Sequence, residues 1–320
     1  MKRAITLAGL LILSCVGALG QAPGVGSSNE FTFYFGVNGY EPASRFGEPA
    51  DVAVDERKGL IYVADVKAGV IDAFSVQGIP KFQYGAKNGI KAPVGLAVDR
   101  TGNLYVSEND GGPIKVINAK GEVTTIELPA EPESGKETPK AGRMAFDRDW
   151  NLYVVDRANS RILAFDKNRT FLFRFGGFGE KRGEFKLLQD VAVDRQGRIY
   201  AADAVAVPIQ VFDRRGQYIY GFGSRTQGTD NLSFPAALYV DRNDQVWVVD
   251  KNLHAVKVFD RSGGFLRSFG SYGQGEGSLF YPNAIASDGM GRIYVLEFGA
   301  RRLQAFMVAR PFEPFSISGF

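Results

Sequence analysis

The sequence predicts an all-β fold, a six-bladed β-propeller built from four-stranded antiparallel blades. The first observation is a pentad of residues that returns six times, at spacings of 44 to 48 residues. The second is that further short runs of β-branched and aromatic residues follow each pentad, and the third is that no helical periodicity separates these runs. Four short antiparallel strands per repeat, six times over, are typical of a propeller.

The pentad is the first strand of each blade, and its fifth residue is always aspartate. Its copies are DVAVD, GLAVD, RMAFD, DVAVD, ALYVD and AIASD, at 51–55, 95–99, 143–147, 190–194, 237–241 and 284–288. Turn sequences such as DRTGN, DRQGR and DGMGR follow it. In these turns Asp bonds its own backbone and Gly accepts a positive φ, which predicts a hairpin to the second strand.

The second strand of each blade ends in an acidic residue. Its copies are IYVAD, LYVSE, LYVVD, IYAAD, VWVVD and IYVLE, at 61–65, 104–108, 152–156, 199–203, 246–250 and 293–297. We interpret these acids as caps that bind backbone N–H groups of the adjoining loops, because every blade needs such a cap.

The third and fourth strands complete the blade. Third strands are expected at 70–75, 114–119, 162–166, 209–213, 255–260 and 303–308. Fourth strands are clearest as FLFRFG, YIYGFG and FLRSFG, at 171–176, 218–223 and 265–270.

The last repeat has no fourth strand after its third, because the chain continues as ARPFEPFSISGF with two prolines that would interrupt a ladder. The stretch FTFYFG at 31–36 has the composition and the position of a fourth strand. We therefore expect 31–36 to pair with 303–308 and close the ring, with the tail from Phe312 as the competing candidate.

Residues 1–20 have the layout of a secretory signal peptide: two basic residues, an apolar run and small residues before the expected cleavage site. Two processing routes stay open, cleavage after Gly20 and a lipoprotein cut before Cys15, which would then carry a lipid. In either case we expect export to the periplasm or the extracellular space, with attachment to the outer membrane if Cys15 is lipidated. The mature chain then consists of a short linker at 21–30, the propeller at 31–310 and a tail at 311–320.

These residues resemble the NHL repeat. The fullest copy is GRMAFDRDWNLYVVDRANSRILAFD at 142–166, with Asp156, Asn159 and Arg161 at the positions typical of the family. Glu297 and Arg302 keep part of the pattern. Other copies depart from it, with Val70, Pro113, Pro208 and Ala255 in place of the arginine. The resemblance implies the propeller fold, whereas its implication for function is broad, because similar rings serve as binding platforms, sensors, RNA readers and enzymes.

Composition excludes several kinds of site. Cys15 is the only cysteine and His254 the only histidine, so neither a disulfide framework nor a zinc site of two or three imidazoles can form. The histidine-ligated zinc of the amidating lyase that resembles NHL rings is therefore not carried over. Without Lys2 and Arg3, 36 basic and 35 acidic side chains leave a net charge of +1, which does not indicate nucleic-acid binding. We predict no catalytic residue, no resident metal and no cofactor, and the sequence leaves open a calcium-like ion at the channel mouth.

The loops between blades and the loops after the second strands should emerge on one face of the ring, where basic and aromatic residues gather. We predict that this face binds a protein partner of the cell envelope. The candidate residues are Arg45, Phe46, Lys91, Arg143, Arg157, Lys251, His254, Tyr281, Phe298 and Arg301.

The sequence thus favours an exported, non-catalytic binding or scaffold module, with no small-molecule substrate and no membrane contact beyond a lipid anchor. One alternative is a metal-assisted hydrolase or lactonase at the channel mouth, for which Glu48, Asn283, Asp203 and Asp250 could be recruited. The other alternative is a carbohydrate-binding platform.

Overall fold

The computed structural model describes residues 30–130 and 137–309. The expected signal segment, Cys15, most of the linker and the tail at 311–320 lie outside the described residues. Within those two ranges, no helix has the length and apolar character needed to cross a membrane.

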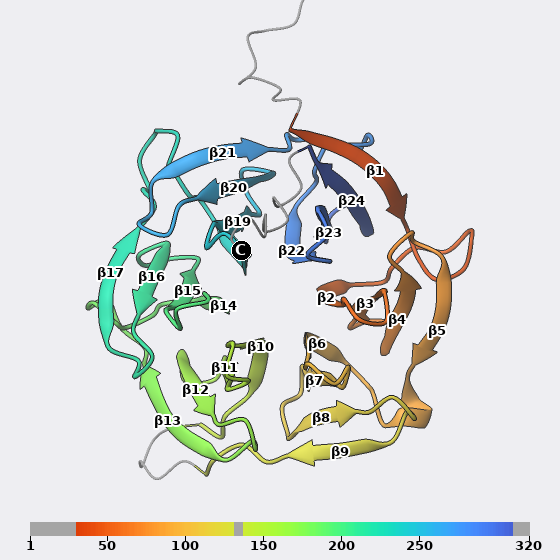
Figure 1. The fold of residues 1–320 in the computed structure, drawn as a ribbon, viewed down its shortest axis with the longest axis horizontal. Helices are drawn as coiled ribbons and strands as arrows, with labels where there is room; N and C mark the ends of the chain where they lie inside the picture. The colour runs from red at the N-terminus through yellow and green to blue at the C-terminus, as the bar shows by residue number, and fades with distance from the viewer. Residues whose placement is uncertain (1–29, 131–136, 310–320) are drawn as a thin grey trace, which may run out of the picture.

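Six sheets of four antiparallel strands each are arranged as a ring, which confirms the predicted six-bladed all-β propeller (Figure 1). Blade 1 consists of β2 (Pro49–Asp55), β3 (Leu60–Asp65), β4 (Val70–Ser75) and β5 (Pro80–Tyr84). Blade 2 consists of β6 (Pro93–Val98), β7 (Leu104–Glu108), β8 (Ile114–Ile117) and β9 (Val123–Ile126). Blade 3 consists of β10 (Ala141–Phe146), β11 (Leu152–Asp156), β12 (Arg161–Phe165) and β13 (Phe171–Gly176). Blade 4 consists of β14 (Leu188–Val193), β15 (Ile199–Asp203), β16 (Ile209–Phe212) and β17 (Tyr218–Phe222). Blade 5 consists of β18 (Pro235–Val240), β19 (Val246–Asp250), β20 (Ala255–Phe259) and β21 (Phe265–Phe269). Blade 6 consists of β22 (Pro282–Ser287), β23 (Arg292–Glu297), β24 (Arg302–Val308) and β1 (Phe31–Val37). A 3-10 turn, η1 (Ala86–Asn88), joins blades 1 and 2.

The N-terminal strand β1 is the outermost strand of blade 6. It pairs antiparallel with β24, in a register that runs from Phe31 opposite Val308 to Val37 opposite Leu303. The Phe31 ring also stacks on Phe269 of blade 5, with centroids 4.4 Å apart. The first and the last strand of the described chain therefore lie side by side in one sheet.

The core lies between neighbouring blades. Tyr62 and Ile71 of blade 1, for example, pack against Leu96, Val106 and Ile117 of blade 2. The middle strands are buried on both faces, which explains why their sequences are continuous apolar runs rather than alternating ones. Truncating one of these buried isoleucines to Ala should cost about 2–5 kcal/mol.

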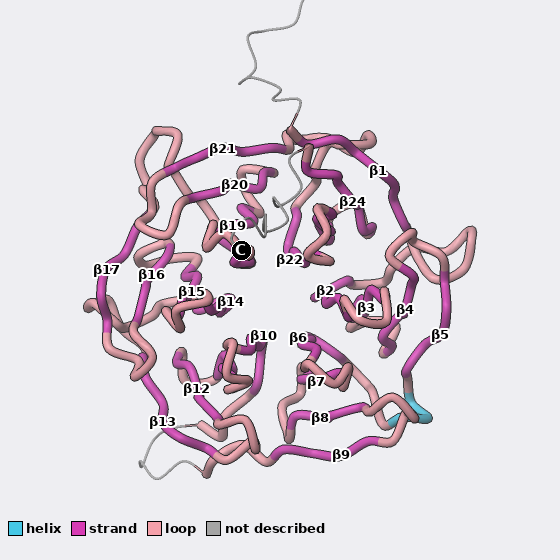
Figure 2. The backbone as a smooth tube through the Cα atoms, viewed as in Figure 1, coloured by secondary structure: helices cyan, strands magenta, loops and turns pink. Residues whose placement is uncertain are grey.

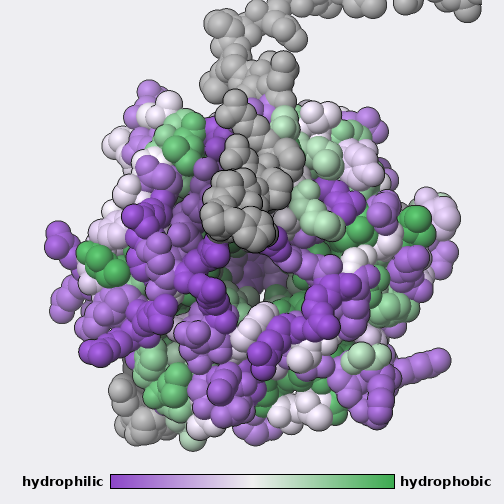
Figure 3. Space-filling model, in the orientation of Figure 1, coloured by the Kyte–Doolittle hydropathy of each residue, from purple (hydrophilic) through white to green (hydrophobic). Residues whose placement is uncertain are grey.

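The first strand of each blade lies nearest the centre of the ring, and the fourth strands form the periphery (Figure 2). We call the side with the blade-to-blade loops and the loops after the second strands the mouth face. The opposite side, which carries the hairpin turns between first and second and between third and fourth strands, is the turn face. Figure 3 shows hydrophilic residues surrounding the central hollow on one face of the ring.

Candidate functional site at the channel mouth

The acids that end the second strands are engaged as caps. Both carboxylate oxygens of Asp65 accept backbone N–H bonds, from Gly47 at 2.5 Å and from Glu48 at 2.9 Å. Glu297 accepts from Phe280 N at 2.7 Å. The same arrangement recurs at Glu108, Asp156, Asp203 and Asp250. This confirms the capping interpretation, and these carboxylates are committed to holding the loops of the mouth face.

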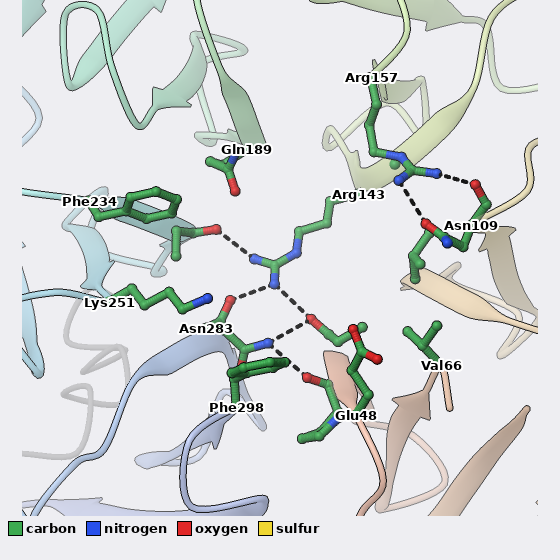
Figure 4. A pocket seen from close by; sticks show the side chains of 15 residues that line it. Glu48, Val66, Asn109, Arg143, Arg157, Gln189, Phe234, Lys251, Asn283 and Phe298 are labelled. Carbon is green, nitrogen blue, oxygen red and sulfur yellow. Dashed lines mark hydrogen bonds between the residues drawn. The ribbon is translucent and has the colours of Figure 1, made fainter. Parts of the chain in front are cut away.

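Arg143, on β10, extends across the centre of the ring (Figure 4). Its Nη1 donates to Ala236 O at 2.9 Å, and its Nη2 donates to Ala50 O at 2.8 Å and to Asn283 O. These carbonyls belong to blades 5, 1 and 6, so one guanidinium of blade 3 ties together the inner strands of three other blades.

Two buried carboxylates flank this guanidinium. Asp51 Oδ1 lies 3.6 Å from Nε of Arg143, and Asp190 Oδ2 lies 3.4 Å from its Nη1. Burial raises the pKa of both aspartates against the opposing effect of Arg143, and the pKa of Asp190 reaches about 6. Each aspartate also accepts a backbone N–H bond from the next blade, Asp51 from Leu96 and Asp190 from Leu238, both at 2.8 Å. Asp51, Arg143 and Asp190 are each the first residue of a pentad, and together they therefore link neighbouring blades.

Arg143 lines two cavities of the central channel. The mouth cavity has a volume of about 280 Å³, and an inner cavity of about 230 Å³ lies beside Asp51 and Asp190. The polar and aromatic side chains that line the mouth cavity are Glu48, Asn109, Arg143, Arg157, Gln189, Phe234, Lys251, Asn283 and Phe298. Three of these are cations and one is a carboxylate, so the lining favours an anionic group.

Lys251 differs from the other two cations of this lining, because the guanidiniums of Arg143 and Arg157 are both held by hydrogen bonds. Its Nζ lies 4.6 Å from the ring centroid of Phe298 and 5.9 Å from that of Phe234. Its ammonium has no hydrogen bond or ion pair with any residue in the part of the chain that the structure describes. Burial, together with the charge of Arg143, holds the pKa of Lys251 below its usual range. A carboxylate bound beside Nζ would relieve both effects.

Arg157 is anchored at the opposite side of the mouth cavity. Its Nη1 donates to Asn109 Oδ1 at 3.2 Å and its Nη2 to Asn109 O at 3.0 Å, which joins blade 3 to blade 2. Burial of the guanidinium lowers its pKa. Figure 4 shows Arg157 and Lys251 on opposite walls, with Arg143 between them.

His254 belongs to an aromatic cluster on the rim of the mouth face. Its Nδ1 accepts a hydrogen bond from Tyr281 N at 3.1 Å, and its ring stacks on Phe280 with an interplanar angle of 12°. Tyr272 is 71% exposed and Tyr281 38% exposed, so this cluster presents aromatic surface to solvent.

The structure places most of the predicted face residues on the mouth face. Arg45, Lys91, Arg157, Tyr281, Phe298 and Arg301 are exposed, and Lys251 and His254 are partly exposed. Two assignments to an exposed rim are wrong. Phe46 is only 2% exposed because it fills the core against Phe74, and the side chain of Arg143 is only 12% exposed because its charge is engaged in the channel.

Sequence reasoning missed Asp51, Asp190, Asn109 and Gln189. A signal for the two aspartates was present, because the first pentad position reads Asp51, Gly95, Arg143, Asp190, Ala237 and Ala284 while the second position is apolar in every copy. Charges at a position that strand geometry turns towards the ring axis indicate a buried network. Asn109 and Gln189 carry no such signal.

The residues of the mouth do not fit a divalent cation. Among the described residues, no group of three or more His, Cys, Asp or Glu side chains is arranged to hold a metal ion. In the lining of the mouth cavity, three cationic side chains outnumber the one carboxylate, Glu48. A divalent cation would be repelled there.

The fold is shared with solved structures of diverse activity. A structural-genomics protein of unknown function from Bacteroides thetaiotaomicron is similar with a TM-score of 0.68 and 15% identity, over 87% of this chain and 75% of that one. A gluconolactonase from Xanthomonas campestris has a TM-score of 0.62 and 17% identity over 82% and 86% of the two chains. A catalytically inactive virginiamycin B lyase from Staphylococcus aureus has a TM-score of 0.58 and 14% identity over 87% and 99%.

No protein-family profile and no curated protein matches the chain. At 14–17% identity these likenesses show the fold alone, and the fold accommodates binding modules and enzymes alike.

Proposed function

We propose that the mature chain is an exported, non-catalytic binding module whose mouth face holds a protein partner of the cell envelope. The partner is proposed to insert an acidic side chain into the mouth cavity. The observation that carries this proposal is Lys251, a half-buried cation with a lowered pKa and no counter-charge among the described residues.

The neighbouring groups favour a peptide over a free anion. Asn283 Oδ1 is buried and has no hydrogen-bond partner in the described part of the chain, although its Nδ2 donates to Pro49 O at 2.9 Å. A peptide supplies both missing groups, a carboxylate for Lys251 and a backbone N–H for Asn283 Oδ1.

The rim offers apolar contact area beside the charged cavity. Phe298 is 41% exposed next to Lys251, and the cluster of His254, Tyr272 and Tyr281 lies on the same face. Aromatic residues around a buried charge are typical of protein interfaces, where they supply most of the binding energy.

The test is affinity capture from the envelope fraction of the source cells. Wild-type mature protein should retain one major protein, and Lys251→Glu should lose it because the new carboxylate repels the acidic group of the partner. Lys120→Glu, an exposed change on the turn face, is the matched control and should retain the protein. Equal retention by Lys251→Glu, or no retention by the wild type, contradicts the proposal.

The proposed export is tested by a separate measurement on protein isolated from cells. The mature protein isolated from cells should begin near Gln21, or should carry a lipid on Cys15, when its mass is determined. A protein that retains residues 1–20 in the cytoplasm contradicts this part of the proposal.

A hydrolase or lactonase at the same mouth is the second candidate. It is favoured by Glu48 and Asn283, which lie together in the mouth cavity. The cationic lining weighs against the metal that such an enzyme would use. Turnover of a lactone panel in added calcium, abolished by Glu48→Gln, would replace the binding proposal with the enzyme.

A further inference from the structure

A second pocket lies on the turn face, between blades 2 and 3 and away from the mouth cavity. It is bounded by the turns at 99–103, 147–151 and 166–170, and its volume is about 870 Å³. Its lining residues are Asp99, Arg100, Thr101, Tyr105, Arg148, Asp149, Trp150, Lys167, Asn168 and Arg169. None of them takes part in the site at the channel mouth.

Two lining residues occupy backbone positions that the other blades give mainly to glycine. Trp150 has a φ of 67° at the left-handed position of the first turn. The equivalent positions hold Gly59, Gly102, Gly197, Asp244 and Gly291, all with positive φ. A bulky side chain is strained in this conformation, so Trp150 stands where glycine would suffice.

Arg169 also stands in place of a glycine, at the turn between the third and fourth strands of the same blade. Its φ is 69°, whereas Gly78, Gly121, Gly216 and Gly263 occupy the equivalent turns. Arg169 and Trp150 are also in contact, because Nη1 of Arg169 donates to Trp150 O at 2.8 Å. Blade 3 therefore places the strained side chains of its two turn-face hairpins in one pocket.

The strained pair builds one wall of the pocket. The Arg169 guanidinium lies 4.9 Å from the ring centroid of Phe146, and the rings of Phe146 and Trp150 are 5.7 Å apart. Nε of Arg169 donates to the Tyr105 hydroxyl at 2.8 Å. These contacts fix the guanidinium, while its Nη2 has no hydrogen-bond partner among the residues described.

The charge of the pocket is positive. Arg100, Arg148 and Lys167 are exposed, and no ion pair joins their side chains to any described residue. Of the two acids, Asp99 is occupied by hydrogen bonds from its own turn, and Asp149 lies 3.7 Å from Arg214. Four cations around a partly exposed indole fit a ligand that combines an anion with a flat ring face.

We propose that this turn-face pocket binds an acidic oligosaccharide with a carboxylate on its sugar rings. The Trp150 indole would stack on a sugar face, and the Arg148 guanidinium would bind the carboxylate through paired N–H bonds. The free Nη2 of Arg169 would add a further N–H bond. The Asn168 amide and the Asp149 carboxylate bind hydroxyl groups. The cavity of about 870 Å³ has room for more than one sugar residue.

Asp149 also argues for a sugar chain over a nucleic acid. A DNA strand presents a phosphate at every nucleotide and no sugar hydroxyl that could donate to Asp149. A sugar acid presents donor hydroxyls beside each carboxylate, and a carboxylate of the protein accepts hydrogen bonds from such hydroxyls.

The protein contains two tryptophans, and this makes the site observable. Trp247 is 1% exposed in the core, so Trp150 is the indole that a ligand can reach. Titration of the wild type with trigalacturonic acid should shift the tryptophan emission, and calorimetry should give a saturable dissociation constant. Maltotriose, a neutral sugar chain, should bind at least tenfold more weakly, because it lacks the carboxylates.

Two variants test the site without unfolding it. Trp150→Gly should keep the melting temperature, because glycine occupies the equivalent turns of four other blades. It should weaken trigalacturonate binding about tenfold by calorimetry. Arg148→Ala should weaken binding about fivefold, whereas Arg195→Ala, the equivalent residue of blade 4, should leave it unchanged.

The proposal is overturned by any of three results. These are no saturable binding of trigalacturonic acid, the same affinity in wild type and Trp150→Gly, and tighter binding of a single-stranded oligonucleotide than of the sugar. The last result would reassign the pocket to nucleic acid.

Discussion

Arg143 Nη1 and Asp190 Oδ2 lie 3.4 Å apart at the centre of the ring, although they come from different blades. The guanidinium also bonds carbonyl oxygens of three further blades. A propeller is held mainly by contacts between adjacent blades, and this network adds contacts across the channel. Arg143 therefore both forms the floor of the mouth cavity and contributes to the stability of the ring.

The first prediction concerns Arg143. Arg143→Leu leaves Asp51 and Asp190 without their counter-charge, and removing one member of a buried ion pair costs about 3–5 kcal/mol. Urea denaturation should show a loss of this size. Arg100→Leu is the control, and it should cost about 1 kcal/mol or less, since Arg100 is exposed and its side chain forms no ion pair with any described residue. A urea midpoint of Arg143→Leu equal to that of the wild type would show that the guanidinium does not hold the ring.

The second prediction concerns pH. Asp190 has a folded pKa of about 6 against 3.8 for the ordinary side chain, because burial disfavours its charged form. Between about pH 4 and pH 6 the folded state retains a proton that the unfolded chain has released. The free energy of unfolding should therefore fall as the pH rises through this window, by at most about 3 kcal/mol from this one group.

Asp190→Asn removes that titration. Measured at pH 4, 5, 6 and 7, the unfolding free energy of the wild type should decline relative to that of Asp190→Asn, and the decline should end above about pH 6. Parallel pH profiles for the two proteins would contradict a raised pKa at Asp190.

The third prediction concerns the strand that joins the two ends of the ring. Deletion of residues 31–36 removes most of β1, exposes the edge of β24 and breaks the stacking of Phe31 on Phe269. The melting temperature should fall by about 10 °C, and the protein should aggregate more readily. Tyr34→Ala, at a side chain that is 48% exposed, should change it by no more than about 2 °C. A deletion variant that melts like its parent would show that β1 contributes little to the ring.

The fold was readable from the sequence because each blade repeats the same local signals. The pentads, the Asp–Gly turns and the acids that end the second strands each specify one element, and 31–36 was placed by its composition and its spacing. The residues of the candidate site were predicted less completely than the fold. Phe46 follows the exposed loop residue Arg45, and Arg143 lies in the first strand of its blade, but the inward direction of both side chains depends on the ring geometry.

For the turn-face pocket, too, the sequence does not show which side chains come together. Trp150 and Arg169 stand where other blades have glycine, which is visible in the sequence, yet their contact joins two turns and requires the folded blade. Breaks in a repeat thus mark candidate sites, and the structure determines which breaks come together.

The most direct test of the account is site-specific photocrosslinking in intact cells. A photoreactive residue replacing Phe298 lies on the mouth face beside Lys251, whereas one replacing Met290, which is 61% exposed, lies on the turn face. We predict that the Phe298 position crosslinks to one envelope protein, that Lys251→Glu abolishes this product, and that the Met290 position gives none. Crosslinking of the same protein from Met290, or a Phe298 product that persists with Lys251→Glu, would contradict the assignment of the mouth face as the binding surface.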